Sequence, residues 1–270
     1  MPARPITFLS DYGTGDEFAG VCRAVIARIA PDAKVIDLTH GVPRHDVREG
    51  ALALVNSLPF APPGVHLAVV DPGVGTARRP VAVGVKEEDR VLVGPDNGLL
   101  SLAWARLGGA VEAVDLSASK FRLEPASATF HGRDLFAPVA ASVALGAALS
   151  EAGEGIDPAS LRALEIPAPR IWPDRVVAHV VRVDRFGNLS LNLRHEDLAG
   201  GPLRLGEPLA VECAGRQTDA AFARTYEDVS RGEVLLYEDS SGSLALAVNR
   251  GSAADLLGLD RDDEVVLRSP

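Results

Sequence analysis

Cysteine is scarce in this chain, and its scarcity excludes two kinds of structure. The 270 residues include 2 cysteines, Cys22 and Cys213, which lie far apart and form no CxxC pair. A cysteine-rich zinc site is therefore excluded, and a disulfide framework is not expected. Histidine pairs of the HxH or HExxH kind are also missing, which weakens the case for a metal site.

Positive charge is also in short supply. Lys and Arg number 27 against 37 Asp and Glu, which gives a formal net charge of −10 at pH 7. A nucleic-acid partner requires a basic face, so this balance argues against one. The same balance is compatible with a cationic small-molecule ligand.

Long hydrophobic runs are the third thing the sequence lacks. The longest apolar helical segment, residues 135–149, is too short to span a bilayer and contains Pro138 and Ser142. No signal-peptide pattern opens the chain, because Asp11 and Asp16 interrupt it early. With 47% hydrophobic and 24% charged residues, we expect a folded protein with no membrane partner and, by default, a cytoplasmic enzyme.

The first half of the chain alternates short apolar runs with amphipathic segments. The pattern predicts strands at residues 6–9, 35–38, 65–70, 81–85, 91–93 and 110–116, and helices at 18–29, 47–58, 99–107 and 135–149. Thr14 and Glu17 have the spacing of a capping box before the first helix. This alternation predicts an α/β domain with a mostly parallel, doubly wound sheet.

The second half has a different character. Four prolines between residues 150 and 174 indicate a linker, which we place at 156–174, between an α/β domain at 1–155 and a β-rich domain at 175–270. Beyond it, short strands are predicted at residues 176–183, 189–193, 209–213, 233–237, 243–248 and 264–267. Their spacing favours a small all-β domain, an antiparallel barrel or a sandwich.

Polar side chains follow several predicted strands of the first domain. Asp11, Asp71 and Asp96 come directly after apolar runs, and His131 stands in a loop before a helix. Parallel strands would bring these strand ends to one rim of the sheet, where open α/β folds bind ligands. A metal site, an acid–base site and a site for a cationic or ribose-bearing ligand all fit this set. Phosphate-binding patterns such as GxxxxGK[ST] and a GxGxxG after a strand are missing.

The turn after Asp71 is the most distinctive of these loops. Arg78 is close enough along the loop to fold back and pair with Asp71, which would lower the pKa of the carboxyl. The alternative is an ordinary crossover turn with a solvated salt bridge. Sequence spacing alone leaves both open.

Six motifs, in order along nearly the whole chain, resemble a known family. They are ITFLSDYG at residues 6–13, VVDPGVGTARR at 69–79, VGPDNGLL at 93–100, TFHGRD at 129–134, VDRFGNL at 183–189 and LALAVNRGSAA at 244–254. Together they resemble the S-adenosyl-L-methionine hydroxide adenosyltransferases, hydrolases related to fluorinase and chlorinase enzymes. The resemblance implies hydrolysis of S-adenosyl-L-methionine to adenosine and L-methionine, with no cofactor. It also implies an α/β domain followed by a small β-domain.

The resemblance also implies roles for individual residues. The family's Asp–Arg–His catalytic set falls on Asp71, Arg78 and His131. The substrate-binding residues that it implies are Asp11 at the ribose, Asp184 and Ser240 at the methionine amino group, Phe186 and Asn188 at adenine, and Asn249. It further implies a homotrimer in which the β-domain of a neighbouring subunit closes over the ligand.

Several alternatives stay open at this point. Arg79 stands beside Arg78 and Ser241 beside Ser240, so each of these assignments depends on register. The stretch from Asp184 to Asn188 can be an ordinary β-turn, and Asn249 can cap a strand instead of contacting adenine. The rival functions are a halide-dependent adenosyl transferase and a non-catalytic sensor of an adenosyl ligand. The Asp-Pro-Gly sequence at Asp71, which the halogenating relatives lack, favours water as the nucleophile.

Overall fold

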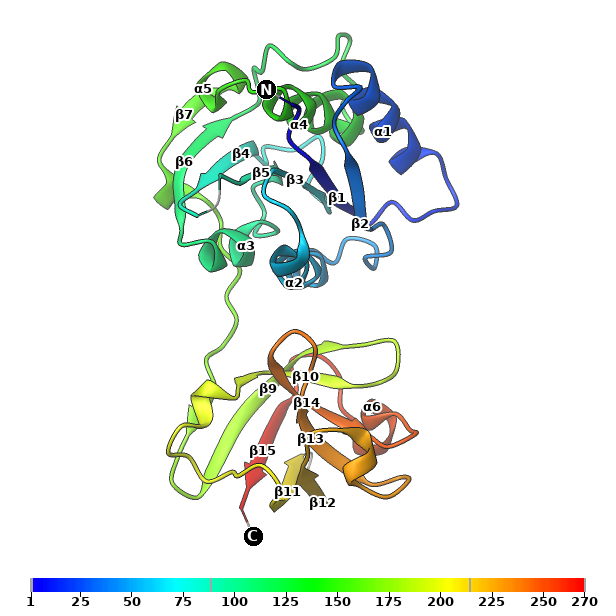
Figure 1. Cartoon of the computed structure of the whole chain (residues 1–270), viewed down its shortest axis with the longest axis vertical. Helices are drawn as coiled ribbons and strands as arrows, with labels where there is room; N and C mark the ends of the chain where they lie inside the picture. The colour runs from blue at the N-terminus through cyan, green and yellow to red at the C-terminus, as the bar shows by residue number, and fades with distance from the viewer. Residues whose placement is uncertain (1, 88, 214, 270) are drawn as a thin grey trace. The chain divides into compact units, whose positions relative to one another are not determined.

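The chain folds as two units, each with its own core. The computed structural model describes residues 2–87, 89–213 and 215–269, and it divides into Met1–Leu164 and Glu165–Pro270 (Figure 1). The division falls inside the stretch 156–174, where the sequence predicts the linker. Each unit is described by itself below.

A mixed sheet forms the centre of the first unit. Within its described residues, seven strands pair in the order β2-β1-β3-β5-β4-β6-β7. They are β1 (Ile6–Ser10), β2 (Val35–Thr39), β3 (Val65–Val69), β4 (Pro80–Val85), β5 (Val91–Pro95), β6 (Ala110–Asp115) and β7 (Glu154–Ile156). Strands β2, β1, β3 and β5 are mutually parallel, while β4, β6 and β7 run antiparallel to their neighbours. The predicted parallel-rich sheet is confirmed, with an antiparallel edge added to it.

Helices cover both faces of this sheet. They are α1 (Phe18–Ile29), α2 (Val47–Ser57), α3 (Ser101–Arg106), α4 (Ala137–Ala144) and α5 (Leu149–Ala152), with short turns at Leu58–Phe60 and Pro158–Ser160. Helices α1 and α4 pack together on one face, and α2 and α3 pack on the other (Figure 1). Burial on both faces explains why β1 and β3 are apolar runs without polar alternation.

Two helical predictions are wrong in detail. The expected capping box at Thr14 is not formed, because α1 begins at Phe18 and its N-cap residue, Glu17, makes no side-chain capping hydrogen bond. The expected continuous helix at 135–149 is instead a π-helical turn, Gly132–Phe136, followed by α4, a break, and α5. Single π-helical turns inside helices are frequent at functional sites.

The antiparallel direction of β4 determines what meets at one rim of the sheet. The parallel strands β1, β3 and β5 all end at this rim, just before Asp11, Asp71 and Asp96. Because β4 pairs antiparallel with β5, with Pro80 opposite Pro95, β4 starts where those strands end. The residues before β4, including Arg78, therefore reach the same rim as Asp71.

The second unit is a closed barrel. Among its described residues, the strands are β8 (Arg170–Ile171), β9 (Arg175–Val183), β10 (Leu189–Arg194), β11 (Pro208–Cys213), β12 (Arg216–Phe222), β13 (Val234–Glu238), β14 (Ser243–Val248) and β15 (Glu264–Arg268). Seven of them pair in the order β10-β14-β13-β12-β11-β15-β9, and a further pairing of β9 with β10 closes the ring. Helix α6 (Ala253–Leu257) and short turns at Glu196–Leu198 and Tyr226–Asp228 connect strands.

The barrel confirms one of the two predicted all-β forms and corrects its strand directions. Alternating burial in β10 and β11 points every second side chain into one apolar core that includes Leu191 and Val211. One neighbouring pair, β12 with β13, is parallel, so the barrel is not purely antiparallel. Strand β12 was not predicted from the sequence, because its first half, Arg-Gln-Thr-Asp, is polar.

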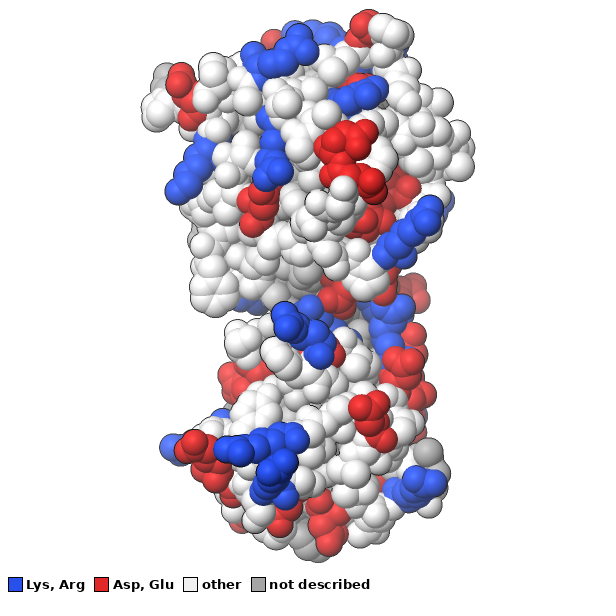
Figure 2. Space-filling view, turned by 90° about the vertical axis from the view of Figure 1, so that its right-hand side faces the viewer, with Lys and Arg blue, Asp and Glu red and all other residues white. Residues whose placement is uncertain are grey.

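Charge is mixed over the surface. On the face drawn in Figure 2, acidic and basic side chains are interspersed and form no continuous basic strip. That face therefore offers no track for a phosphate backbone. In the described parts of the chain, no helix has the length and apolar character needed to cross a membrane.

Candidate active site

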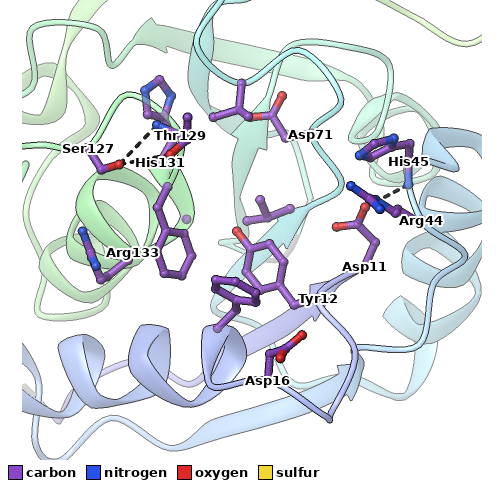
Figure 3. A pocket seen from close by; sticks show the side chains of 15 residues that line it. Asp11, Tyr12, Asp16, Arg44, His45, Asp71, Ser127, Thr129, His131 and Arg133 are labelled. Atoms are coloured by element: carbon purple, nitrogen blue, oxygen red, sulfur yellow. Dashed lines mark hydrogen bonds between the residues drawn. The ribbon is translucent and has the colours of Figure 1, made fainter.

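A cavity of about 680 Å³ opens at the sheet rim of the first unit (Figure 3). Asp11 reaches it from the end of β1, Asp71 from the end of β3, and His131 from the turn before the π-helical segment. These three predicted site residues therefore share one cavity. Arg78 lies directly behind Asp71, as the contacts below show.

The turn between Asp71 and Arg78 is built by local hydrogen bonds. The Val74 N–H donates to the Asp71 carbonyl at 3.3 Å, and the Thr76 hydroxyl donates to the Gly73 carbonyl at 2.7 Å. Gly75 has a φ of +78°, and a Cβ there would lie 3.0 Å from the Ala128 carbonyl oxygen. This position favours glycine, because an L side chain is strained at that φ.

Arg78 connects the other two members of the predicted catalytic set. Its Nε donates to Asp71 Oδ1 at 3.0 Å, and its Nη2 donates to Asp71 Oδ2. The same Nη2 lies 3.2 Å from His131 Nδ1. The Arg78 and Asp71 side chains are each 6% exposed, so this bidentate pair is a buried ion pair. The solvated salt bridge that the sequence left open is excluded.

The protonation states of the set follow from these contacts. Burial raises the pKa of Asp71, and the Arg78 guanidinium offsets only part of that rise. The pairing lowers this pKa as expected, but desolvation outweighs that effect, so the net shift is upward. Burial, together with the Arg78 charge, lowers the pKa of His131, which favours the neutral imidazole.

The tautomer of His131 is fixed by its partner. A guanidinium can only donate, so His131 Nδ1 must accept from Arg78, and the ring proton sits on Nε2. In this arrangement His131 offers the cavity a hydrogen-bond donor. Asp71 keeps one acceptor position for the cavity, because a carboxylate has about four and Arg78 and the Gly73 N–H occupy three.

One nitrogen of Arg78 stands apart. Its Nη1 is buried and has no hydrogen-bond partner among the described residues, while the guanidinium carbon lies 5.5 Å from the centre of the Phe136 ring. A cation over an aromatic face is stabilised by the ring quadrupole, which offsets part of the cost of the unpaired N–H. The π-helical turn that carries Phe136 thus also supports the Arg78 side chain.

Arg79 turns to a different carboxylate. It donates from Nε and Nη2 to Asp96 Oδ2, at 3.1 and 2.6 Å, and from Nη1 to the Ser160 hydroxyl at 3.1 Å. The Arg162 N–H donates to the other Asp96 oxygen at 2.7 Å. Asp96 and Arg79 therefore fasten the end of the first unit to the rim, and only Arg78 contacts Asp71.

Asp11 is held by the loop after β2. Its Oδ2 accepts a hydrogen bond from the His45 N–H at 2.9 Å, and His45 has a φ of 65° (Figure 3). One oxygen of Asp11 is thus occupied, while Oδ1 is left to face the cavity. Sequence reasoning missed His45, because a backbone donor from a distant loop has no signature in residue type.

A chain of hydrogen-bonded side chains, buried at Ser10 and His40 and exposed at Asp37, lies beside the Asp11 turn. The Ser10 hydroxyl lies 2.8 Å from His40 Nδ1, and His40 Nε2 lies 3.0 Å from Asp37 Oδ1. The order resembles a Ser-His-Asp nucleophilic triad, but Ser10 is 0% exposed and cannot reach a ligand. The His40 carbonyl also accepts from the Gly13 N–H at 2.7 Å. The chain therefore positions the turn and does not act as a nucleophile.

The remaining predicted residues lie in the second unit. Asp184 Oδ1 accepts from the backbone N–H groups of Phe186 and Asn188, and Asp184 Oδ2 accepts from the Asn188 side chain at 2.8 Å. The stretch thus forms an Asp-capped turn, in which Asn188 is buried and Phe186 is 65% exposed. The Arg185 guanidinium carbon lies 5.0 Å from the centre of the Phe186 ring, so stacking on a planar ligand would use the other face of the ring.

Ser240 and Asn249 occupy different surroundings. Ser240 is exposed in the turn after β13, and the neighbouring Ser241 donates its N–H to Asp239 Oδ1 at 2.8 Å. The Asn249 side chain donates to the Val229 carbonyl at 2.8 Å. This contact fits the strand-capping alternative for Asn249 that the sequence left open.

No metal centre emerges from the side chains. Across residues 2–87, 89–213 and 215–269, no group of three His, Cys, Asp or Glu side chains is placed to hold a metal ion. The cavity is lined by the carboxylates of Asp11, Asp16 and Asp71, the guanidinium groups of Arg44 and Arg133, and the residues His45 and His131, with Arg78 behind Asp71. These groups can bind a polar ligand, accept a proton and donate hydrogen bonds.

The fold is a parallel-rich α/β unit with a polar site at its sheet rim, followed by a seven-stranded barrel. Comparisons with known families identify the family that has this architecture. Residues 6–153 match the SAM hydroxide adenosyltransferase N-terminal domain, and residues 178–266 match the corresponding C-terminal domain. The chain belongs to the SAM hydroxide adenosyltransferase family, which confirms the resemblance carried by the six motifs.

Named relatives span nearly the whole chain. A (R)-S-adenosyl-L-methionine hydrolase of Salinispora tropica is 47% identical over 264 residues, covering 98% of this chain and 97% of that protein. One of Thermus thermophilus is 40% identical and covers 95% of this chain and 96% of that protein. A fluorinase of an Actinoplanes species is 29% identical and covers 94% of this chain and 95% of that protein.

Solved structures share the fold. A crystal structure of an uncharacterized conserved protein from Thermotoga maritima superposes with a TM-score of 0.89 at 35% identity, covering 97% of this chain and 99% of that one. A conserved hypothetical protein from Thermus thermophilus has a TM-score of 0.78 at 40% identity, covering 98% and 99%.

Proposed function

We propose that this protein hydrolyses S-adenosyl-L-methionine to adenosine and L-methionine. The observation that carries the proposal is the contact of Arg78 with both Asp71 and His131 beside a cavity that Asp11 also lines. Relatives that bear the name (R)-S-adenosyl-L-methionine hydrolase, at 40 and 47% identity over nearly the whole chain, support it.

The reaction is a single in-line displacement. The oxygen of a water molecule forms a bond to ribose C5′ while the bond from C5′ to sulfur breaks, and the bonding pair stays on sulfur. Sulfur changes from a sulfonium cation to the neutral thioether of methionine, and the water loses one proton. Because the leaving group is already positively charged, the enzyme needs only to position and deprotonate the water in a dry site.

Asp71 is the proposed general base. Burial raises its pKa, which makes the carboxylate a better proton acceptor, while Arg78 keeps it ionised enough to act. His131 is the third member of the proposed catalytic set: its Nδ1 accepts from Arg78 and helps to hold the guanidinium beside Asp71.

The substrate contacts are proposed on the same basis. Asp11 keeps Oδ1 for the ribose hydroxyls, and one oxygen can accept two hydrogen bonds. The methionine and adenine ends of the substrate are proposed to be held by Asp184, Phe186, Asn188, Ser240 and Asn249. The family resemblance supports a homotrimer in which a neighbouring subunit provides these residues. A cytoplasmic location stays an expectation from the sequence.

The decisive experiment uses heavy-oxygen water. The protein is incubated with S-adenosyl-L-methionine in ¹⁸O-water, and the products are analysed by mass spectrometry. Adenosine with one heavy oxygen at the 5′ position should accumulate together with methionine. Methylthioadenosine, S-adenosylhomocysteine or unreacted substrate as the outcome would refute the proposal.

Two controls separate the rival functions. Chloride or fluoride should not accelerate substrate loss, whereas a halide-dependent transferase would require it and form a halogenated nucleoside. The Asp71→Asn variant keeps the shape of the side chain and removes the base, so hydrolysis should fall by about 10²–10⁴-fold. A sensor of adenosyl ligands would bind the substrate without turnover in either protein.

A further inference from the structure

Tyr12 occupies the floor of the rim cavity, next to Asp11 at the end of β1. Its hydroxyl points toward the space between His131 and Asp71 (Figure 3). Among the described residues, no side chain or backbone group is a hydrogen-bond partner of Tyr12 Oη. A tyrosine hydroxyl in such a position usually has a partner, so a ligand atom is expected to supply it.

The Tyr12 ring is fixed in place by other aromatic rings. Phe8 and Phe130 contact it edge-on, with ring centres 6.4 and 5.8 Å away, and Phe18 lies tilted at 6.0 Å. The backbone N–H of Tyr12 is held by the Ser10 hydroxyl at 3.3 Å. Little rotamer freedom is left to the side chain, so the direction of its hydroxyl is set before any ligand binds.

Gly132 leaves the room that this hydroxyl occupies. A Cβ at residue 132 would lie 2.0 Å from Tyr12 Oη, 3.0 Å from Cζ and 3.4 Å from Cε2. Gly132 has no left-handed φ, so conformational freedom does not explain the glycine. The close approach of the Tyr12 phenol explains why residue 132 is glycine. The Tyr12 hydroxyl therefore lies directly beside the residue that follows His131.

The hydroxyl acts as a donor at neutral pH. Burial raises the pKa of Tyr12, and the negative charges of Asp11 and Asp71 raise it further. A phenol that keeps its proton can donate one hydrogen bond.

We propose that Tyr12 donates this hydrogen bond to the reacting oxygen, which is the water oxygen before the reaction and the 5′-oxygen of adenosine after it. The inference rests on the proposed function, because that reaction turns the one oxygen into the other. The water oxygen has two lone pairs: one attacks C5′ and the second accepts from Tyr12. Asp71 takes the proton on the opposite side. Tyr12 thus orients the nucleophile, and Gly132 is required for it.

Product binding tests this proposal without depending on turnover. Adenosine carries the 5′-oxygen and 5′-deoxyadenosine lacks it, so the affinity of both nucleosides is measured by calorimetry. Tyr12→Phe removes only the hydroxyl. We expect it to weaken adenosine binding by about three- to tenfold and to leave 5′-deoxyadenosine unchanged. In hydrolysis, kcat should fall while KM for S-adenosyl-L-methionine changes little.

Two further variants control the interpretation. Tyr12→Phe should unfold at the wild-type temperature, because the lost hydroxyl has no hydrogen-bond partner in the described part of the chain. Tyr226→Phe removes a hydroxyl that donates to Tyr237 at 2.9 Å, and should leave both nucleoside affinities unchanged. Gly132→Ala should weaken adenosine binding more in the wild-type background than in Tyr12→Phe, where the nearest atom would be Cζ at 3.0 Å.

The outcomes separate this inference from the proposed function. Equal loss of affinity for both nucleosides in Tyr12→Phe would place the donor on another atom, such as the ribose ring oxygen, and overturn the inference alone. No loss for adenosine would overturn it as well. Wild-type protein that binds adenosine but does not hydrolyse the substrate would count against the proposed function only.

Discussion

At the scale of single residues, the pKa of Asp71 is governed by two opposing effects. Burial disfavours the carboxylate and raises the pKa, while the Arg78 charge favours the carboxylate and lowers it. The net direction is upward, so Asp71 takes up a proton at a higher pH than an ordinary aspartate. Only the ionised form can accept a proton from water. Activity should therefore rise with pH through the pKa of Asp71.

Removing the positive charge of Arg78 should shift the pH range in which activity rises, which is the acid limb of the pH–activity profile. Arg78→Gln takes away the effect that lowers the Asp71 pKa, and an opposite charge at such a distance is worth about 1–3 pH units. The limb of the kcat/KM profile should shift upward by that amount. Arg78→Lys, which keeps the charge but loses the bidentate geometry, should lower kcat with a smaller shift. An unmoved limb in Arg78→Gln would mean that another group is the base.

Much of the residue-scale site was open to prediction. The pairing of Arg78 with Asp71 was predictable because a glycine-bounded turn of a few residues brings them together locally. The choice between Arg78 and Arg79 was not, because it depends on Asp96 at the end of another strand. The sign of the Asp71 pKa shift was not predictable either, since burial depends on the whole fold.

At the scale of elements, β3 carries a buried histidine in the sheet. His66 is 0% exposed and stands opposite Thr7 of β1, with Nδ1 2.8 Å from the Thr7 hydroxyl. Arg90, just before β5, lies 3.1 Å from Nε2 and can only donate, so the ring proton is on Nδ1. Burial, Arg90 and Arg4 lower the pKa of His66 to about 3.

This histidine should make the first unit less stable in acid. An unfolded chain protonates His66 near its ordinary pKa of about 6.5, whereas the folded protein does so near pH 3. Between these values the unfolded state binds the extra proton, so the free energy of unfolding falls as pH falls from 6.5 toward 3. At pH 5 the loss relative to pH 7 should be about 2 kcal/mol.

The measurement compares wild-type protein with His66→Gln, which retains a donor and an acceptor but does not titrate. Trp172→Phe serves as the background for both, so that Trp104 fluorescence reports the first unit during urea unfolding. The His66→Gln protein should lose about 2 kcal/mol less between pH 7 and pH 5. Equal losses in the two proteins would show that His66 does not carry this dependence.

Local patterns predicted individual elements better than their connections. The first six predicted strands of the α/β unit correspond to β1 to β6, because each is an apolar run between turn residues. The antiparallel insertion of β4 between β5 and β6 and the parallel β12–β13 pair were not predicted. Strand pairing joins residues far apart in sequence, so no local pattern encodes it. The close approach of Tyr12 to Gly132 likewise joins residues far apart in sequence.

At the scale of the whole molecule, the proposed site draws on both units. The Asp71 set belongs to Met1–Leu164, whereas Asn188 and Phe186 belong to Glu165–Pro270. A cyclic trimer with heterologous contacts would let the second unit of one chain complete the site of the next. The alternative is that each chain completes its own site. The family resemblance favours a site shared between neighbouring chains. Mixing two inactive variants distinguishes this arrangement from a site within one chain.

The last prediction concerns mixed trimers of two inactive variants. Asp71→Ala inactivates the half of the site in the first unit, and Asn188→Ala inactivates the half in the second unit. The two variant proteins are mixed one to one under conditions that exchange subunits. If sites are shared, every mixed trimer contains one site with two unmutated halves. Random mixing then restores about one quarter of wild-type activity. If each chain carries a complete site, every site keeps one lesion and mixing restores nothing.

Folding of the second variant needs its own control, because the Asn188 side chain is buried and bonds to Asp184. Phe186→Ala alters an exposed ring in the same turn and should preserve the barrel, so it repeats the test without that risk. Native mass spectrometry of one isotopically labelled variant confirms subunit exchange. Exchange without recovery of hydrolysis, in both pairings, would rule out the shared site. Recovery in both pairings requires that Asp71 of one chain acts together with the turn around Asn188 of another.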